Sequence, residues 1–155
     1  MNPLVLQIHN LLIKNKKSIA VAESCTAGGL SKQLTETPGS SAYFIAGIAA
    51  YSNRAKTKLL GIPTGLITKK GAVSQEVALK MAEKIRQLTR ADIGIGITGI
   101  AGPKGESPRK PVGTVFIAVQ DNKHCLCERY QFKGNRSKVR ETAVKQALLL
   151  LKRIL

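Results

Sequence analysis

The sequence predicts an α/β fold: a single-domain α/β sandwich in which helices flank a mixed sheet. Short apolar segments of strand length alternate with longer segments whose apolar residues recur every three to four positions, and two adjacent strand-like segments follow. The 155 residues are enough for one domain with its own hydrophobic core, and the sequence has no internal repeat or linker. We therefore expect one domain over residues 1–155.

Helices and strands are expected to alternate through the first half of the chain. Leu4, Ile8 and Leu11 recur at helical spacing and predict an opening helix. Pro38 follows the second expected helix and stops it, and Asn53 is suited to cap the third. The expected elements are a helix over 3–16, a strand over 18–22, a helix over 27–37, a turn over 40–44, a strand over 47–51 and a helix over 53–60.

The second half is expected to hold a helix, a strand, a long loop, a hairpin and a final helix. Ser74 is suited to cap a helix whose buried face includes Leu88. Gly94 and Gly96 in the next strand predict close packing of a neighbouring element. The other expected elements are a strand over 91–97, a loop over 99–111, a hairpin of 112–120 with 124–132, and a last helix with Val139, Ala143, Ala147, Leu150 and Ile154 facing inward.

The chain is strongly basic, with 25 Lys and Arg residues against nine acidic residues and a formal net charge of +16. Such a charge attracts phosphorylated molecules at low salt. The basic residues are scattered and are not interleaved with aromatic residues, which make up 4% of the sequence, so a nucleic-acid partner is not expected. No uncharged segment reaches membrane-spanning length, so we expect a cytoplasmic protein without a membrane partner.

The cysteines do not point to a metal site. Cys125 and Cys127 form a C-x-C pair with only Cys25 elsewhere, which is not the spacing of a zinc site. An odd number of cysteines fits the reduced thiols of a cytosolic protein. No segment shows a carboxylate cluster suited to magnesium, so we expect neither a metal nor a cofactor.

Three segments combine hydroxylated residues with glycine, at which main-chain N–H groups can approach a ligand closely. They are 22–29, 38–41 and 96–103, and a fourth segment, 51–56, adds a phenol and an amine. No Asp–His pair accompanies any of these serines, so a serine nucleophile here would need a lysine as its base. The sequence therefore indicates a site built on serine and lysine.

Six motifs in this order resemble the C-terminal domain of the CinA competence-damage-inducible family over nearly the whole chain. They are AESCTAGG at 22–29, PGSS at 38–41, YSNRAK at 51–56, GAVS at 71–74, TGIAGP at 98–103 and PVGTV at 111–115. Stand-alone members are similar to nicotinamide mononucleotide deamidase, which yields nicotinic acid mononucleotide and ammonia. The resemblance implies a Ser/Lys dyad, which we place on Ser41 and Lys56, with Tyr51 holding or relaying the proton.

The substrate, nicotinamide mononucleotide, is expected to contact the turn after the first strand and the glycine loop. Ser24 can hold either the lysine or the substrate, and Glu23 is a partner for Lys56 or Arg54, or a charge favoured by the helix dipole. Arg136 is a candidate for a phosphate clamp, together with Lys138 and Arg140. The expected substrate-binding residues are Ser24, Glu23, Thr26, Gly28, Thr98, Gly99, Ala101, Gly102 and Arg136.

Other interpretations of these residues remain open from the sequence. Ser41 can be a helix cap, Lys56 a solvated lysine and Tyr51 the end of a core strand. Cys25 can be the nucleophile of a cysteine amidase, although no motif supplies a histidine base. A non-catalytic module that binds nucleotide or DNA is the alternative function, and exposed Ile and Leu residues make a homodimer a further expectation.

Overall fold

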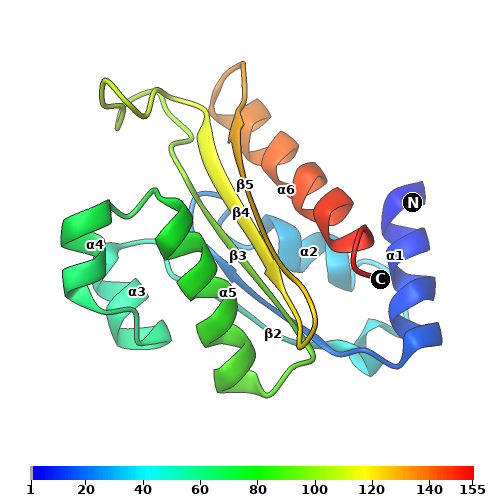
Figure 1. Cartoon of the computed structure of the whole chain (residues 1–155). Helices are drawn as coiled ribbons and strands as arrows, with labels where there is room; N and C mark the ends of the chain where they lie inside the picture. Colours follow the sequence, from blue (N-terminus) through cyan, green and yellow to red (C-terminus); the bar gives the residue numbers. More distant parts are fainter. Residues whose placement is uncertain (1) are drawn as a thin grey trace.

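A five-stranded mixed sheet lies at the centre of the molecule, and helices cover both of its faces (Figure 1). The computed structural model describes residues 2–155. The α/β fold predicted from the sequence is therefore confirmed. In chain order the elements are α1 Pro3–Asn15, β1 Ile19–Glu23, α2 Gly29–Thr35, the 3-10 helix η1 Ser40–Ala42, β2 Phe44–Ala49, α3 Asn53–Leu60, α4 Thr64–Lys70, α5 Gln75–Thr89, β3 Ile93–Gly99, β4 Thr114–Gln120, β5 Cys125–Gln131 and α6 Arg136–Lys152.

The strand order is β2-β1-β3-β4-β5, so the sheet is half parallel and half antiparallel. β1 pairs in parallel with β2 and β3, and Glu23 at its end lies beside Ala49 and Ile97. β4 pairs antiparallel with both β3 and β5. Because the three parallel strands end at one edge of the sheet, the residues that follow them are brought together there.

Each face of the sheet has its own hydrophobic core. Helices α1, α2 and α6 cover one face, and α3, α4 and α5 cover the other (Figure 1). β1 is buried along its whole length because it lies in the interior of the sheet between the two helical layers. The core under α1, α2 and α6 includes Val5, Ile8, Leu12, Leu30, Leu34, Val139, Ala143, Ala147 and Leu150, and the core under α3, α4 and α5 includes Leu60, Ile62, Ile67, Val77, Met81 and Ile85.

The two glycines of β3 allow α5 to pack directly on the strand. A Cβ atom at Gly94 would overlap the carbonyl oxygen of Ala82, and one at Gly96 would overlap the carbonyl oxygen of Ala78. Both carbonyls belong to the backbone of α5. The close packing that these glycines predict is confirmed, and it sets the distance between α5 and the sheet.

The structure differs from the sequence prediction at several elements. β2 begins at Phe44, three positions before the expected start, because the Tyr43 carbonyl already accepts a hydrogen bond from the Ile19 N–H group at 2.8 Å. The short helix α4 was not expected, since its seven residues bury only Ile67 and show no apolar period. Leu88, expected in the core, is 61% exposed because it lies on the outer side of α5. Ile154 lies beyond the end of α6 and is half-buried.

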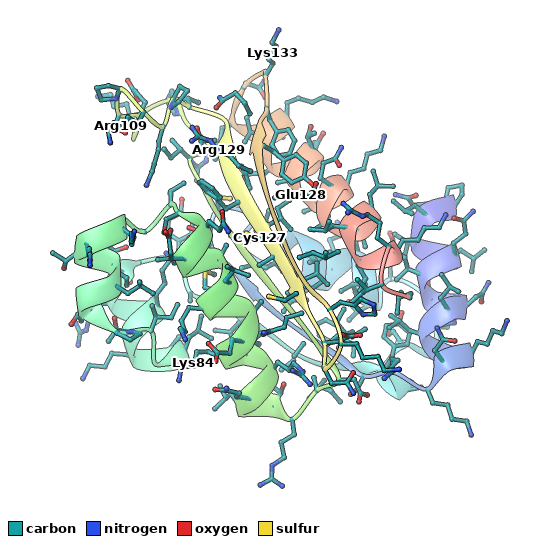
Figure 2. All side chains as sticks on the ribbon, viewed as in Figure 1. Lys84, Arg109, Cys127, Glu128, Arg129 and Lys133 are labelled. Carbon is teal, nitrogen blue, oxygen red and sulfur yellow. The ribbon has the colours of Figure 1, made fainter. Side chains whose placement is uncertain are left out.

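The basic side chains are distributed over the surface. Lys84 extends from α5, Arg109 from the loop between β3 and β4, and Lys133 from the loop before α6 (Figure 2). This distribution agrees with the scattered basic charge of the sequence. Within residues 2–155, no helix combines the length and the apolar character needed to cross a membrane.

Candidate active site

A cavity of about 180 Å³ lies at the edge of the sheet where β1 and β3 end. Its walls come from the turn after β1, the start of α3, the segment before α5 and the loop after β3, and α6 closes one side. Seven of its eleven lining residues belong to the set expected from the sequence. The lining residues are Ser24, Cys25, Tyr51, Asn53, Lys56, Ala72, Val73, Thr98, Gly99, Ala101 and Arg136.

Lys56 lies in the first turn of α3 and is only 2% exposed. Its Nζ donates hydrogen bonds to the Ser24 hydroxyl and to the Tyr51 carbonyl, both at 3.0 Å. No carboxylate within residues 2–155 forms an ion pair with it. Burial disfavours the charged ammonium and lowers the pKa of Lys56. A buried lysine without an acidic partner is suited to act as a base.

Ser24 is held beside this amine by the end of the sheet. Its N–H group donates to the Ile97 carbonyl at 3.0 Å and so continues the pairing of β1 with β3 by one residue. Its side chain lines the cavity although the residue is only 6% exposed. The position of the hydroxyl is therefore fixed by the backbone, in contact with the lysine and open to a ligand.

Glu23 and Gly28 shape the turn from outside the cavity. The buried Glu23 carboxylate accepts hydrogen bonds from the N–H groups of Gly28 (3.2 Å), Leu30 (3.0 Å) and Ser31 (2.9 Å), and from the Ser31 hydroxyl (2.8 Å). Gly28 adopts a positive φ of 94°, which glycine tolerates without strain. Neither residue lines the cavity, so the expectation that they bind substrate is corrected: Glu23 caps the start of α2, and the Gly28 N–H group is bonded to Glu23. Glu23 also does not pair with Lys56.

Thr26 lies in the same turn but also points away from this cavity. The residue is 1% exposed, and its carbonyl accepts a hydrogen bond from Arg140 Nη2 at 3.2 Å. It lines a different cavity, between α2 and α6. Its expected contact with the substrate is therefore not supported, because the turn directs the side chain to the other side of the backbone.

Ser41 lies at the opposite end of β2 from Lys56. It belongs to the 3-10 helix that precedes the strand, and its side chain is exposed. β2 has six residues, which corresponds to about 20 Å of extended chain between Ser41 and Tyr51. The expected pairing of Ser41 with Lys56 within one chain is therefore wrong. In the structure, Ser24 is the serine that contacts Lys56.

Tyr51 and Arg136 form the rim of the cavity. The Tyr51 phenol accepts a hydrogen bond from Arg136 Nη2 at 2.7 Å, while Arg136 Nη1 donates to the Gly102 carbonyl at 2.8 Å. Tyr51 is 54% exposed and contacts Lys56 through its carbonyl rather than through its phenol. Gly102 thus contributes by anchoring the arginine, and a guanidinium at the mouth of the cavity is suited to an anionic group.

The end of β3 and the loop after it supply the opposite wall. The Thr98 hydroxyl donates to the Ala72 carbonyl at 2.8 Å and joins the end of β3 to the segment before α5. A Cβ atom at Gly99 would lie 2.7 Å from Val115 Cγ2 and 3.1 Å from Cys25 Sγ, so only glycine fits there. Thr98, Gly99 and Ala101 line the cavity, and their contact with a substrate stays a prediction.

Cys25 lines the cavity but is not activated. The residue is 4% exposed, and burial raises the pKa of its thiol to about 11. His9 contacts Tyr43, with Nδ1 3.2 Å from the phenol oxygen, and His124 contacts Asp121. Neither histidine lines the cavity, so Cys25 has no histidine base there. Among residues 2–155, no group of three or more His, Cys, Asp or Glu side chains is placed to hold a metal.

Three of the lining residues were not expected at the site from the sequence. Asn53 was expected to cap α3, but Ser52 is the cap, since its hydroxyl accepts from the Ala55 N–H group at 3.0 Å. Asn53 is therefore free to line the cavity. Ala72 and Val73 lie in the GAVS motif at 71–74, which was noted as a motif without a role. Its position directly before a capped helix was the only signal available.

Residues 1–155 match the family model of the CinA C-terminal domain. This chain belongs to that family. A CinA-like protein of Geobacter metallireducens is 49% identical over 136 residues, which cover 88% of this chain and 33% of the relative. A CinA-like protein of Leptospira biflexa is 50% identical over 145 residues, which cover 93% of this chain and 35% of the relative. This CinA C-terminal domain therefore spans about a third of the length of these curated relatives.

Solved structures of the CinA superfamily share the fold closely. The competence/damage inducible protein CihA from Agrobacterium tumefaciens is 36% identical, with a TM-score of 0.94 over 97% of this chain and 92% of that one. A competence-damaged protein (CinA) superfamily protein from Escherichia coli is 31% identical, with a TM-score of 0.94 over 98% of this chain and 88% of that one. The resemblance noted in the sequence is confirmed.

Proposed function

We propose that this CinA C-terminal domain is an amidohydrolase that converts nicotinamide mononucleotide to nicotinic acid mononucleotide and ammonia. Ser24 is the nucleophile and Lys56 its base. The observation that supports this assignment is the buried Lys56 amine, which has no carboxylate partner and lies 3.0 Å from the Ser24 hydroxyl inside a cavity. Serine and lysine so arranged can perform acyl transfer without histidine.

In the first step, neutral Lys56 removes the hydroxyl proton of Ser24 while the oxygen attacks the carboxamide carbon. The C=O double bond opens to an oxyanion, and the lysine becomes an ammonium. The main-chain N–H groups of Ala101 and Gly102 have no partner within residues 2–155 and are candidate donors to that oxyanion. The ammonium then gives its proton to the leaving nitrogen, and the C–N bond breaks to release ammonia.

In the second step, water replaces the serine. Lys56 accepts a proton from the attacking water, the ester bond to Ser24 breaks, and the serine oxygen recovers a proton from the lysine. The product is the carboxylate. The same two residues thus serve both halves of the reaction, and the second half needs only water as a co-reactant.

The size of the cavity supports recognition of one aromatic ring. A volume of about 180 Å³ is below the roughly 300–1,000 Å³ of pockets that enclose a drug-sized ligand. A pyridine carboxamide would therefore occupy the cavity while the ribose phosphate extends past its rim. Arg136, exposed at that rim, is the residue that we assign to the phosphate.

The proposal is tested by measuring ammonia and nicotinic acid mononucleotide released from nicotinamide mononucleotide by the purified chain. We expect turnover of the mononucleotide, much weaker turnover of free nicotinamide, and turnover of the mononucleotide reduced about a thousandfold with Lys56→Ala. DNA retention at near-physiological salt is measured on the same preparation. Absence of ammonia release together with specific DNA retention would overturn the proposal in favour of a non-catalytic binding module.

A further inference from the structure

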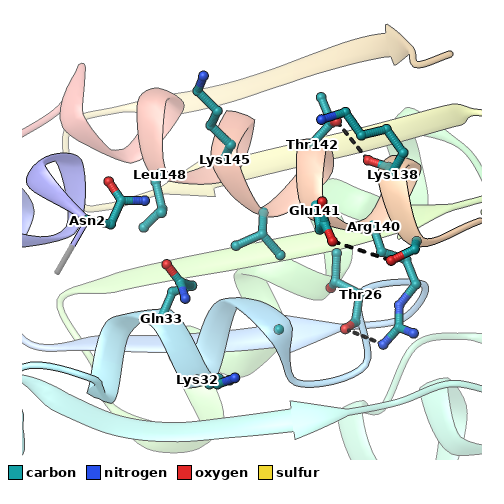
Figure 3. A pocket seen from close by; sticks show the side chains of 13 residues that line it. Asn2, Thr26, Lys32, Gln33, Lys138, Arg140, Glu141, Thr142, Lys145 and Leu148 are labelled. Atoms are coloured by element: carbon teal, nitrogen blue, oxygen red, sulfur yellow. Dashed lines mark hydrogen bonds between the residues drawn. The ribbon is translucent and has the colours of Figure 1, made fainter. Parts of the chain in front are cut away.

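A second and larger cavity, of about 480 Å³, lies between α2 and α6 (Figure 3). It has no lining residue in common with the candidate active site. The two cavities lie on opposite sides of the turn that follows β1, since Ser24 lines the first and Thr26 the second. The function proposed above makes no use of this second cavity.

The walls of this cavity are strongly basic. Lys32, Lys138, Arg140 and Lys145 line it, and Glu141 is its one acidic lining residue. None of these four cations forms an ion pair with a carboxylate within residues 2–155. Four unpaired cations around one hollow repel one another, and a bound anion would relieve that repulsion.

The cavity also contains buried polar atoms without partners. Thr26 is 1% exposed, and its hydroxyl oxygen has no hydrogen-bond partner in the described part of the chain. Arg140 Nε is likewise buried and unpaired within residues 2–155. Buried polar atoms are rarely left without a partner, because the lost hydration is then not compensated. A hydroxyl and a guanidinium N–H at one place are suited to phosphate oxygens.

The two ends of the cavity differ in chemistry. Thr26, Arg140 and Lys138 lie at one end, and Asn2, Gln33 and Leu148 lie at the other (Figure 3). The first end offers charge, whereas the second offers amide groups next to an apolar side chain. This combination suits a molecule with a phosphate at one end and a planar body with polar edge atoms at the other.

We propose that this cavity binds a nucleoside monophosphate, with its phosphate beside Arg140 and Thr26 and its base toward Asn2 and Leu148. The volume of about 480 Å³ lies within the range of pockets that enclose such ligands. Arg140 already donates to the Thr26 carbonyl at 3.2 Å, so its guanidinium is held in place before the ligand arrives. The site is distinct from the one that holds the reacting carboxamide.

The experiment is calorimetric titration of the Lys56→Ala chain, in which turnover is reduced about a thousandfold, with the four ribonucleoside monophosphates, adenosine and inorganic phosphate. We expect at least one monophosphate to bind well above adenosine and inorganic phosphate. Adding Lys145→Glu or Lys138→Glu, which change exposed residues, should weaken that binding about tenfold or more. Lys84→Glu, on the distant surface of α5, removes the same charge and should leave binding unchanged (Figure 2).

Several outcomes would overturn this proposal. One is that no monophosphate binds, and another is that inorganic phosphate binds as well as any of them, since the body of the ligand would then not be recognised. If Lys84→Glu weakens monophosphate binding equally, the effect of the lysine variants comes from net charge and not from this cavity. Simple competition by nicotinamide mononucleotide would make this cavity part of the substrate site. Because binding is measured without turnover, these results are independent of the amidase assay.

Discussion

The turn at residues 24–29 and the turn at residues 38–41 have similar composition but different environments. Both combine serine with glycine, and each lies next to a strand of the parallel part of the sheet. The first follows β1 and places Ser24 beside a buried lysine. The second precedes β2 and leaves Ser41 in solvent. The contacts available to a serine in this fold therefore depend on which end of a strand it occupies.

Strand direction explains the difference. β1, β2 and β3 run in parallel, so the segments after them converge on one edge of the sheet and the segments before them on the other. Lys56 follows β2 and Thr98 lies in the last two residues of β3, and both lie at the same edge as Ser24. Ligand sites of α/β folds form at this carboxyl edge. A serine before β2 is excluded from it by the length of the strand.

The two serines can be compared directly by mutation. Ser24→Ala should reduce kcat for ammonia release by on the order of a thousandfold or more, because it removes the nucleophile. Ser41→Ala, the matched control, should change kcat by less than about threefold because the exposed hydroxyl contacts no group of the cavity. Equal losses at both positions would contradict the comparison. Activity restored by mixing the two variants would then show that a second copy supplies Ser41.

Lys56 should be as important as Ser24 and should act with it. Lys56→Ala and Lys56→Arg should each cost about a thousandfold in kcat, since a guanidinium keeps its proton and cannot serve as a base. The double variant with Ser24→Ala should be hardly worse than either single variant. Steady-state kinetics with circular dichroism as a folding control provides the measurement. Substantial activity in Lys56→Arg would make the lysine an electrostatic anchor only.

The pH dependence of kcat/KM should reflect the buried amine. Burial lowers the pKa of Lys56, and only its neutral form can accept the serine proton. Activity should therefore be present above this pKa and fall about tenfold per pH unit below it, with a midpoint below the ordinary lysine value of about 10.4. If kcat/KM rises only near that ordinary value, the pKa of Lys56 is not lowered in the working enzyme.

Arg136 should affect substrate binding more than chemistry. Arg136→Ala should raise KM for nicotinamide mononucleotide by roughly tenfold or more with a smaller change in kcat, because a charged contact to the phosphate is lost. Arg140→Ala is the comparison variant, since Arg140 lies outside the cavity of Ser24. A larger increase in KM for Arg140→Ala than for Arg136→Ala would show that the phosphate contacts Arg140, on the other side of the turn.

Among the residues that line the cavity of Ser24, the smallest effect is expected at Cys25. Cys25→Ala should keep activity within about tenfold of the unaltered chain, since the thiol is buried and its pKa is raised. Iodoacetamide, which requires a thiolate, should leave the rate of ammonia release nearly unchanged. Rapid inactivation by this reagent that Cys25→Ala abolishes would favour a thiol mechanism.

Much of the fold followed from local patterns, whereas the pairing of site residues did not. The close packing at Gly94 and Gly96 and the bounds of α3 could be predicted, because each depends on a few neighbouring residues. The partner of Lys56 could not be, because Ser24 and Ser41 have similar local sequences and only the sheet order separates them. The capping role of Glu23 could not be predicted either, since it depends on where the N–H groups of α2 point.

The contact between α5 and the glycines of β3 bears on which ring sizes the cavity admits. Thr98 lies one residue before the end of β3, and Val73 lies two residues before the first residue of α5, so opposite walls of the cavity are attached to these two elements. Since the helix backbone rests on the strand backbone, the walls cannot approach further. A methyl group at position 94 or 96 would push α5 outward and widen the cavity. In the proposed enzyme, selectivity for a single aromatic ring would thus depend on packing inside the sheet, at glycines that do not line the cavity.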